Sequence, residues 1–144
     1  MPDTPLAAFP APAMYRDLVE YSTEAAYVVV DGLFVYLNPA ALRLFGASDA
    51  SVLLGTDVLA RIQPDDHKLA LARRRMVLET GVPAPLVEMR FVSLDGRVFE
   101  VEVQATRISY GGKFATYAAA RDISARKQLE EQVRESQKLE AVGR

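Results

Sequence analysis

The sequence predicts an α+β fold in which one five-stranded antiparallel sheet carries short helices on one face. Apolar runs separated by Asp-Gly or Gly-Gly pairs occur near both ends of the chain, and strict apolar–polar alternation marks the second half. Between them lie several short segments with helix-capping residues and terminal glycines. Strands at both ends with helices between them indicate an α+β arrangement rather than a parallel α/β sheet.

The composition restricts the class of protein. The chain has 144 residues, half of them hydrophobic and a quarter charged, which fits one domain with a short appendage. A net charge of −2 gives no basic face for nucleic acid or anionic lipid. The absence of cysteine excludes disulfides, thiolate metal sites and thiol catalysis. No apolar run approaches the roughly 20 residues of a membrane span, so we expect a cytoplasmic chain without a membrane partner.

The first segments of the domain are a lead-in, a helix and a hairpin. Residues 1–13 contain four prolines and lack the features of a signal peptide, so they are expected to be a flexible lead-in. Residues 14–24 have helical apolar spacing. Two short apolar runs, residues 26–30 and 33–37, flank Asp31-Gly32, which is a strong signal for a β-hairpin.

The middle of the chain predicts a succession of helices. Asn38 followed by Pro39 is a favourable helix start, and Gly46 follows Phe45 as a stop. The expected helical segments are residues 39–45, 48–54, 57–62 and 66–80. On the longest one, Leu69, Ala72 and Met76 are expected to face the sheet, whereas the run Arg73-Arg74-Arg75 is expected to be solvated.

Three strands follow, over residues 86–93, 98–108 and 114–120, with turns at Asp95-Gly96 and Gly111-Gly112. In the second of them, apolar residues from Phe99 to Ala105 alternate with glutamate and glutamine, which is typical of a sheet with one wet side. The inner face therefore offers candidates for a ligand pocket, although a closed core explains them as well. The candidates are Met76, Met89, Phe91, Val101, Val103, Thr116, Ala118 and Ala120.

The last segment, residues 124–144, is rich in charged residues and lacks proline, which predicts an exposed helix. The pairs Lys127–Glu131 and Glu130–Arg134 are spaced for ion pairs along it. Its apolar stripe is too thin to be buried in a monomer core, so we expect a coiled-coil-like helix of a homodimer. The large apolar residues of this dimer helix are Leu129, Val133 and Leu139.

Several short motifs, taken in order, resemble the PAS family over residues 15–127. They are Asn38-Pro39-Ala40-Ala41 with Leu44-Phe45-Gly46, Leu54-Gly55 with Gln63-Pro64-Asp65-Asp66, Asp95-Gly96-Arg97, and Arg121-Asp122-Ile123-Ser124-Ala125-Arg126-Lys127. Gln63 stands where the family usually has a histidine. The resemblance implies a profilin-like sheet, a sensory domain over residues 14–123, and a signal junction formed by Asp122 and Arg126.

Residues 136–144 resemble the opening of the dimerisation helix of histidine kinases, whose phosphoacceptor lies further along. The resemblance implies a piece of a longer sensor histidine kinase that acts in a two-component phosphorelay, with downstream kinase domains and a response regulator as partners. The chain itself carries no nucleotide-binding or catalytic motif, so we expect no enzymatic activity from it. Two alternatives stay open, a constitutive dimerisation domain without a ligand and an input domain of a cyclic-di-GMP enzyme.

Some members of the family bind haem or flavin, but this sequence lacks the residues that those relatives use to bind either cofactor. His67 is the only histidine, and it is expected to be a surface residue, because the ligand position of haem-binding relatives corresponds to Ala70. Flavin-binding relatives need a cysteine where Val58 stands here, and amide side chains where Phe91, Val101 and Ala120 stand. We therefore expect no haem, flavin or metal, and at most a small apolar ligand.

Overall fold

The computed structural model describes residues 12–143, and the expected lead-in over residues 1–13 falls almost wholly outside this range. The predicted α+β architecture is confirmed, with one five-stranded antiparallel sheet in the order β2-β1-β5-β4-β3. The elements are α2 (Pro12–Glu20), β1 (Ala25–Val30), β2 (Leu33–Leu37), α3 (Pro39–Phe45), η1 (Ala50–Val52), η2 (Val58–Arg61), η3 (Pro64–Asp66), α4 (His67–Thr80), β3 (Ala84–Val92), β4 (Val98–Tyr110), β5 (Lys113–Asp122) and α5 (Ser124–Val142).

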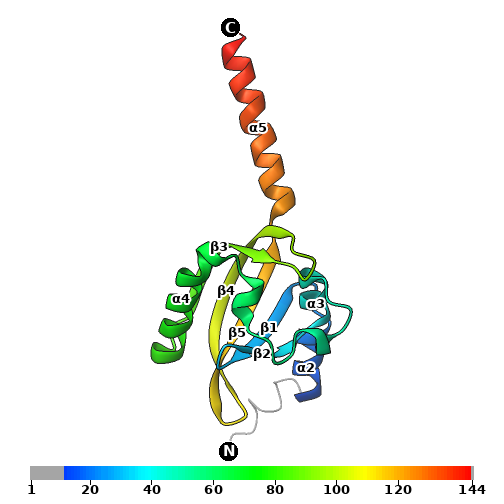
Figure 1. The fold of residues 1–144 in the computed structure, drawn as a ribbon, viewed down its shortest axis with the longest axis vertical. Helices are drawn as coiled ribbons and strands as arrows, with labels where there is room; N and C mark the ends of the chain where they lie inside the picture. Colours follow the sequence, from blue (N-terminus) through cyan, green and yellow to red (C-terminus); the bar gives the residue numbers. More distant parts are fainter. Residues whose placement is uncertain (1–11, 144) are drawn as a thin grey trace, which may run out of the picture.

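The topology brings the two ends of the domain together in the centre of the sheet. The last strand, β5, lies between β1 and β4, and it pairs antiparallel with both. The segment from α3 to α4 crosses over one face of the sheet to reach β3 at the far edge, while α5 projects away from the domain (Figure 1). The helices between β2 and β3 therefore cover one face of the sheet, as the sequence predicts.

The β1–β2 hairpin forms where Asp31-Gly32 predicts it. Asp31 has a φ of 52° and Gly32 a φ of 82°, the left-handed conformations that a two-residue hairpin turn of type I′ requires. Asparagine, aspartate and glycine adopt this region most readily, which explains why this dipeptide is a reliable signal.

Asn38 is a buried polar residue that joins three elements. Its Oδ1 accepts hydrogen bonds from the backbone amides of Ala41 at 2.8 Å and Ala26 at 3.0 Å, so it caps α3 and extends β1. Its Nδ2 donates to the carbonyl oxygens of Val19 at 2.9 Å and Glu24 at 3.0 Å. All four hydrogen-bonding positions of the amide group are used, and α2 is thereby attached to the core.

Aromatic rings fill one half of the core between α3 and the sheet. Phe45 stacks on Phe91 with ring centroids 5.5 Å apart, and it packs edge-on against Tyr27 and Phe34. Phe91 in turn contacts Phe99 edge-on. Such pairs add to the free energy gained by burying the rings. The other half of the sheet, under α4, carries smaller side chains.

Several element boundaries differ from the sequence prediction. The first helix ends at Glu20 rather than residue 24, because Ser22 accepts from the Glu24 amide and turns the chain into β1. The short segments after α3 are 3₁₀ turns rather than α-helices. Strand β3 begins at Ala84 and includes Pro85, which an edge strand tolerates because one row of its amides needs no partner strand.

Candidate functional site

A cavity of about 80 Å³ lies between α4, η2 and the inner face of the sheet. Its floor comes from alternate residues of four strands, and its roof comes from η2 and the inner face of α4. Apolar side chains dominate, and the polar exceptions are one tyrosine, one threonine and two arginines. The lining residues are Tyr27, Val29, Val58, Leu59, Ile62, Ala70, Arg73, Arg74, Met89, Phe91, Val103, Ala105, Thr116 and Ala118.

Most of the pocket candidates from the sequence lie on this floor. Met89, Phe91, Val103, Thr116 and Ala118 line the cavity. The other strand candidates, Val101 and Ala120, are buried in the adjacent core and do not line it.

Met76 does not belong to the cavity, because its side chain is 38% exposed on the outer face of α4. Leu69 is likewise exposed, so the predicted inner face of this helix is wrong. The inner face instead carries Ala70, which lines the cavity, and Val77, which is fully buried. Apolar residues surround most of α4, so its weak amphipathic pattern does not reveal which side packs on the sheet.

Two arginines that the sequence placed in solvent turn inward between these residues. Arg73 lines the cavity and donates from Nη2 to the carbonyl oxygens of Pro85 at 2.7 Å and Val103 at 3.2 Å. Burial lowers the pKa of Arg73 from its usual value. Arg74 lines the cavity on the side of the β1–β2 turn, and its guanidinium lies close to Gly32. A Cβ added to Gly32 would lie only 3.2 Å from the Nη1 atom of Arg74. The i, i+3/i+4, i+7 spacing from Ala70 to Val77 is the signal that could have identified this face.

His67 is not the freely exposed residue that we expected. Its side chain is half-buried at the start of α4, and Nε2 lies 2.7 Å from the carbonyl oxygen of Ile62. The ring thus holds the η2 segment against the helix. Ala70, one turn further along, carries no ligating atom where it lines the cavity.

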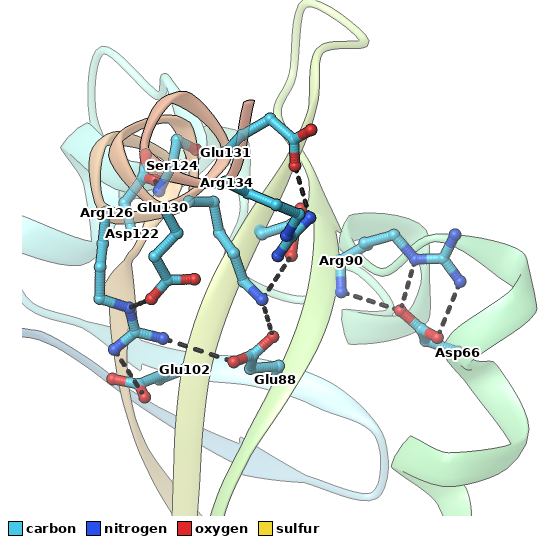
Figure 2. A network of polar contacts seen from close by, with 12 residues as sticks. Asp66, Glu88, Arg90, Glu102, Asp122, Ser124, Arg126, Glu130, Glu131 and Arg134 are labelled. Atoms are coloured by element: carbon cyan, nitrogen blue, oxygen red, sulfur yellow. Dashed lines mark hydrogen bonds and ion pairs between the residues drawn. The ribbon is translucent and has the colours of Figure 1, made fainter. Parts of the chain in front are cut away.

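The junction between the sheet and α5 is a second cluster of polar contacts (Figure 2). Ile123 is buried and donates its amide to the Glu100 carbonyl oxygen, which extends the sheet to the start of the helix. Asp122 Oδ1 accepts from the Ser124 amide at 2.8 Å, so this aspartate starts the helix instead of pairing with Arg126. The two predicted junction residues, Asp122 and Arg126, are therefore not paired with each other, and each has partners of its own.

Arg126 and Lys127 connect α5 to the outer face of β3 and β4. Glu88 and Glu102 lie directly opposite each other in the β3–β4 register, an arrangement that is destabilising for like charges. Arg126 lies 3.1 Å from Glu102 and 3.4 Å from Glu88, and Lys127 lies 2.7 Å from Glu88. The hydrogen bond from Lys127 holds the pKa of Glu88 below its usual range. The two cations thus neutralise the paired carboxylates and fix the first turn of the helix.

The predicted ion pairs along α5 form differently. Lys127 binds the sheet rather than Glu131, and Arg134 pairs with Glu131 rather than Glu130. Glu130 instead lies 3.5 Å from Arg126. The sheet carboxylates attract the first-turn cations, which a pattern confined to the helix does not reveal.

Helix α5 is exposed along its length. None of its residues is buried, and Leu129, Val133 and Leu139 are all exposed, whereas Ile123, just before the helix, is buried. Helix α2 also exposes apolar side chains, with Leu18 at 62% and Tyr21 just beyond its end at 77%. Both helices therefore present apolar surface at positions where the described chain offers nothing to cover it.

Residues 12–143 contain neither a membrane-spanning helix nor a cluster of metal ligands. None of the helices in this range combines the length and the apolar character needed to cross a membrane. The same residues contain no group of three or more histidine, cysteine or carboxylate side chains that could hold a metal ion.

Comparisons with known proteins agree on the fold. Residues 13–123 match the family model described as PAS fold. Over 129 residues the chain is 28% identical to Sporulation kinase A of Bacillus subtilis (strain 168), a match that includes 90% of this chain and 21% of the relative. The chain thus spans about a fifth of the length of this curated relative.

Solved structures give the same result. The PAS domain of a protein from Colwellia psychrerythraea superposes with a TM-score of 0.69 at 19% identity, with 78% of this chain and 97% of that chain covered. The PAS domain of nitrogen regulation protein NR(II) from Vibrio parahaemolyticus gives 0.63 at 25% identity, with 80% and 100% covered. A PAS domain from a two-component sensor histidine kinase gives 0.62 at 21% identity, with 76% and 94% covered.

Proposed function

Since this chain belongs to the PAS family, we propose that it is the signal-input and dimerisation module of a sensor histidine kinase and regulates autophosphorylation downstream. It is a PAS sensory domain related to those of histidine kinases. In this proposal residues 14–123 form the sensory domain, and residues 124–144 form the signalling helix. The lead-in, residues 1–13, has no assigned role.

One observation carries the proposal: on both β3 and β4, one residue lines the cavity while the residue next to it in the strand forms an ion pair with α5. On β3, Met89 lines the cavity while Glu88 binds Arg126 and Lys127 on the opposite face. On β4, Val103 lines the cavity while Glu102 binds Arg126. A displacement of these two strands by a ligand would therefore change the carboxylates that hold the first turn of α5.

The signal would pass as a change between two helix arrangements. A ligand shifts such an equilibrium only as far as it binds one state better than the other. Ion pairs on an exposed sheet face are individually weak, so the α5 junction can rearrange at small cost in free energy. In a homodimer with parallel α5 helices, that rearrangement would reach both kinase domains at once.

The partners in this proposal are a second copy of the chain, the downstream histidine kinase domains and a response regulator. The kinship with a sporulation kinase supports them. Autophosphorylation draws on ATP, so a cytoplasmic location is part of the same proposal. Neither haem nor flavin has a role in it, because Ala70, Val58 and Phe91 offer no ligating or amide atoms to such a group.

The proposal is tested by the oligomeric state of matched variants. Val133→Asp places a charge in the apolar stripe of α5, whereas Ala141→Asp makes the same charge change on another face of the helix. Leu18→Asp tests the apolar surface of α2. A point substitution there is cleaner than removing residues 1–22, because truncation would also remove the Val19 carbonyl that Asn38 binds.

Sedimentation equilibrium over a concentration series measures the result. We expect a dimer for the unaltered chain and for Ala141→Asp, a weaker dimer for Val133→Asp, and a still weaker one for Leu18→Asp, each with an unchanged circular dichroism spectrum of the sheet. An unaltered chain that stays monomeric at high micromolar concentration would contradict the proposal. So would a Val133→Asp variant whose whole domain melts early, because α5 would then pack on its own sheet.

A further inference from the structure

Two arginine side chains lie in the roof of the mainly apolar cavity. Arg73 and Arg74 both line it, and neither forms an ion pair with a carboxylate in residues 12–143. Arg73 is held by two backbone carbonyls. Arg74 Nη1, in contrast, is buried without any hydrogen-bond partner among the described residues. A buried guanidinium N–H without an acceptor is costly, so its retention calls for a partner.

The floor contains a second polar group without a partner. Thr116 is 7% exposed, its side chain lines the cavity, and its Oγ1 has no hydrogen-bond partner within residues 12–143. Val29 and Arg107 are its neighbours across the two adjoining strands. A valine would fill the same space without burying an unpaired hydroxyl, which makes threonine an unfavourable choice for a purely structural floor.

We propose that this cavity binds a small carboxylate with a short apolar chain, whose oxygens accept from Arg74 and Thr116. The inference rests on the proposed function, since it names the class of signal that the sensory domain takes. A carboxylate accepts from a guanidinium through charge-assisted hydrogen bonds and has lone pairs left for a hydroxyl donor. The Arg74 guanidinium is positively charged and only donates, and the Thr116 hydroxyl can donate beside it, so an anion suits the pair and a cation does not.

The size of the cavity restricts the apolar part of the ligand. An engineered cavity of about 150 Å³ binds benzene, so about 80 Å³ accommodates roughly three or four non-hydrogen atoms, and a longer ligand must extend through the open side of the cavity. Met89, Val103 and Ala118 provide apolar contacts for such a chain. Butyrate, with a three-carbon chain and one carboxylate, is a probe of the right charge; its carboxylate and first carbons would occupy the cavity, and the end of its chain would extend toward the opening.

Isothermal titration calorimetry of the whole chain with butyrate tests the inference. Butyramide is the matched probe, because it keeps the shape and loses the charge. Arg74→Gln and Thr116→Val remove the proposed donors, and Arg75→Gln removes the same charge from the exposed neighbour on the same helix. We expect butyrate to bind with a Kd of about 1 mM or tighter, and butyramide about tenfold more weakly or worse. Arg74→Gln should weaken butyrate about tenfold or more, whereas Arg75→Gln should leave it within about twofold.

Thr116→Val gives an independent readout. It should weaken butyrate binding several-fold, while the melting temperature without ligand stays the same or rises, because an unpaired hydroxyl is removed from the interior. A lower melting temperature would show that the hydroxyl has a partner and would overturn its role as a free donor. This variant also keeps the inference testable if Arg74→Gln folds poorly.

Three results would overturn the inference: no heat of binding with butyrate, equal affinity for butyrate and butyramide, or equal effects of Arg74→Gln and Arg75→Gln. None of them bears on the dimer measured by sedimentation, so the proposed function would survive with a different signal. Conversely, a monomeric chain that still binds butyrate through Arg74 would support the site and contradict the proposed function.

Discussion

Asn38→Ala is the substitution whose effect follows most directly from the structure. The asparagine side chain is fully buried, and its amide group makes four hydrogen bonds to the backbone of α2, β1 and α3. Alanine removes all four at once. The amides of Ala26 and Ala41 then lose their acceptor, and both residues are buried.

The expected destabilisation comes mainly from those two amides. Each buried N–H without a partner costs about 1–3 kcal/mol, so the pair costs about 2–6 kcal/mol. The total free energy of unfolding of such a domain is about 5–15 kcal/mol. At roughly 3–5 °C per kcal/mol for a chain of this size, the melting temperature should fall by about 6–30 °C.

Thermal unfolding followed by circular dichroism measures this fall, since the chain has no tryptophan for fluorescence. Tyr36→Phe is the control, because it removes a single 2.6 Å hydrogen bond to the Glu20 carboxylate from the same interface and should cost at most about 1.5–3 kcal/mol, less than the loss of all four Asn38 bonds. Hydrogen exchange should also quicken across α2 in Asn38→Ala, since Asn38 binds the carbonyl at its end. A melting temperature within about 2 °C of the unaltered chain would refute the reasoning.

Further predictions concern the core, acid stability and colour. Phe91→Asp places an unpaired charge at a position that is 1% exposed and should leave no cooperative melt, whereas Leu94→Asp, at a 38% exposed position, should melt nearly as the unaltered chain does. The hydrogen bond from Arg90 lowers the pKa of Asp66 below its usual value of about 3.9. The ionised Asp66 carboxylate therefore contributes its full stabilisation above about pH 4, and this contribution is lost as the pH falls through the lowered pKa. Asp66→Asn should thus make the free energy of unfolding less dependent on pH below about pH 4, as measured by circular dichroism at 222 nm. An unchanged dependence on pH would contradict a stabilising Asp66–Arg90 pair. The purified chain should show neither a Soret band nor flavin absorption, and either one at stoichiometric level would contradict the expected absence of these cofactors.

Much of the fold was predictable because its signals are local. Asp31-Gly32 needs only its own backbone preference to specify the hairpin turn, and Asn38-Pro39 needs only capping geometry to start α3. The alternation from Phe99 to Ala105 follows from having one buried and one solvated side, which the sequence records residue by residue. These features do not depend on which distant segment packs against them.

The features that were missed depend on contacts between segments. The inner face of α4 could not be chosen from its own pattern, because Met76 and Leu69 are as apolar as the residues that face the sheet. Arg73 turns inward because the carbonyls of Pro85 and Val103 are available there, and those residues lie on strands that come later in the chain. Arg126 was expected near Asp122 but binds Glu102, again because of strand register.

The arrangement of α5 in a dimer is the central claim, and distances between spin labels test it most directly. The chain has no cysteine, so Ala125→Cys and Ser136→Cys each give one labelled site per copy, near the start and past the middle of the helix. A parallel pair predicts short distances at both sites, roughly 10–30 Å, from an interaxial distance of about 10 Å plus the label arms. An antiparallel pair crossing near Val133 would add about 24 Å along the axis at Ala125 but only about 9 Å at Ser136, from a rise of about 1.5 Å per residue. A long distance at Ala125 beside a short one at Ser136, or no distance between copies at either site, would contradict the account.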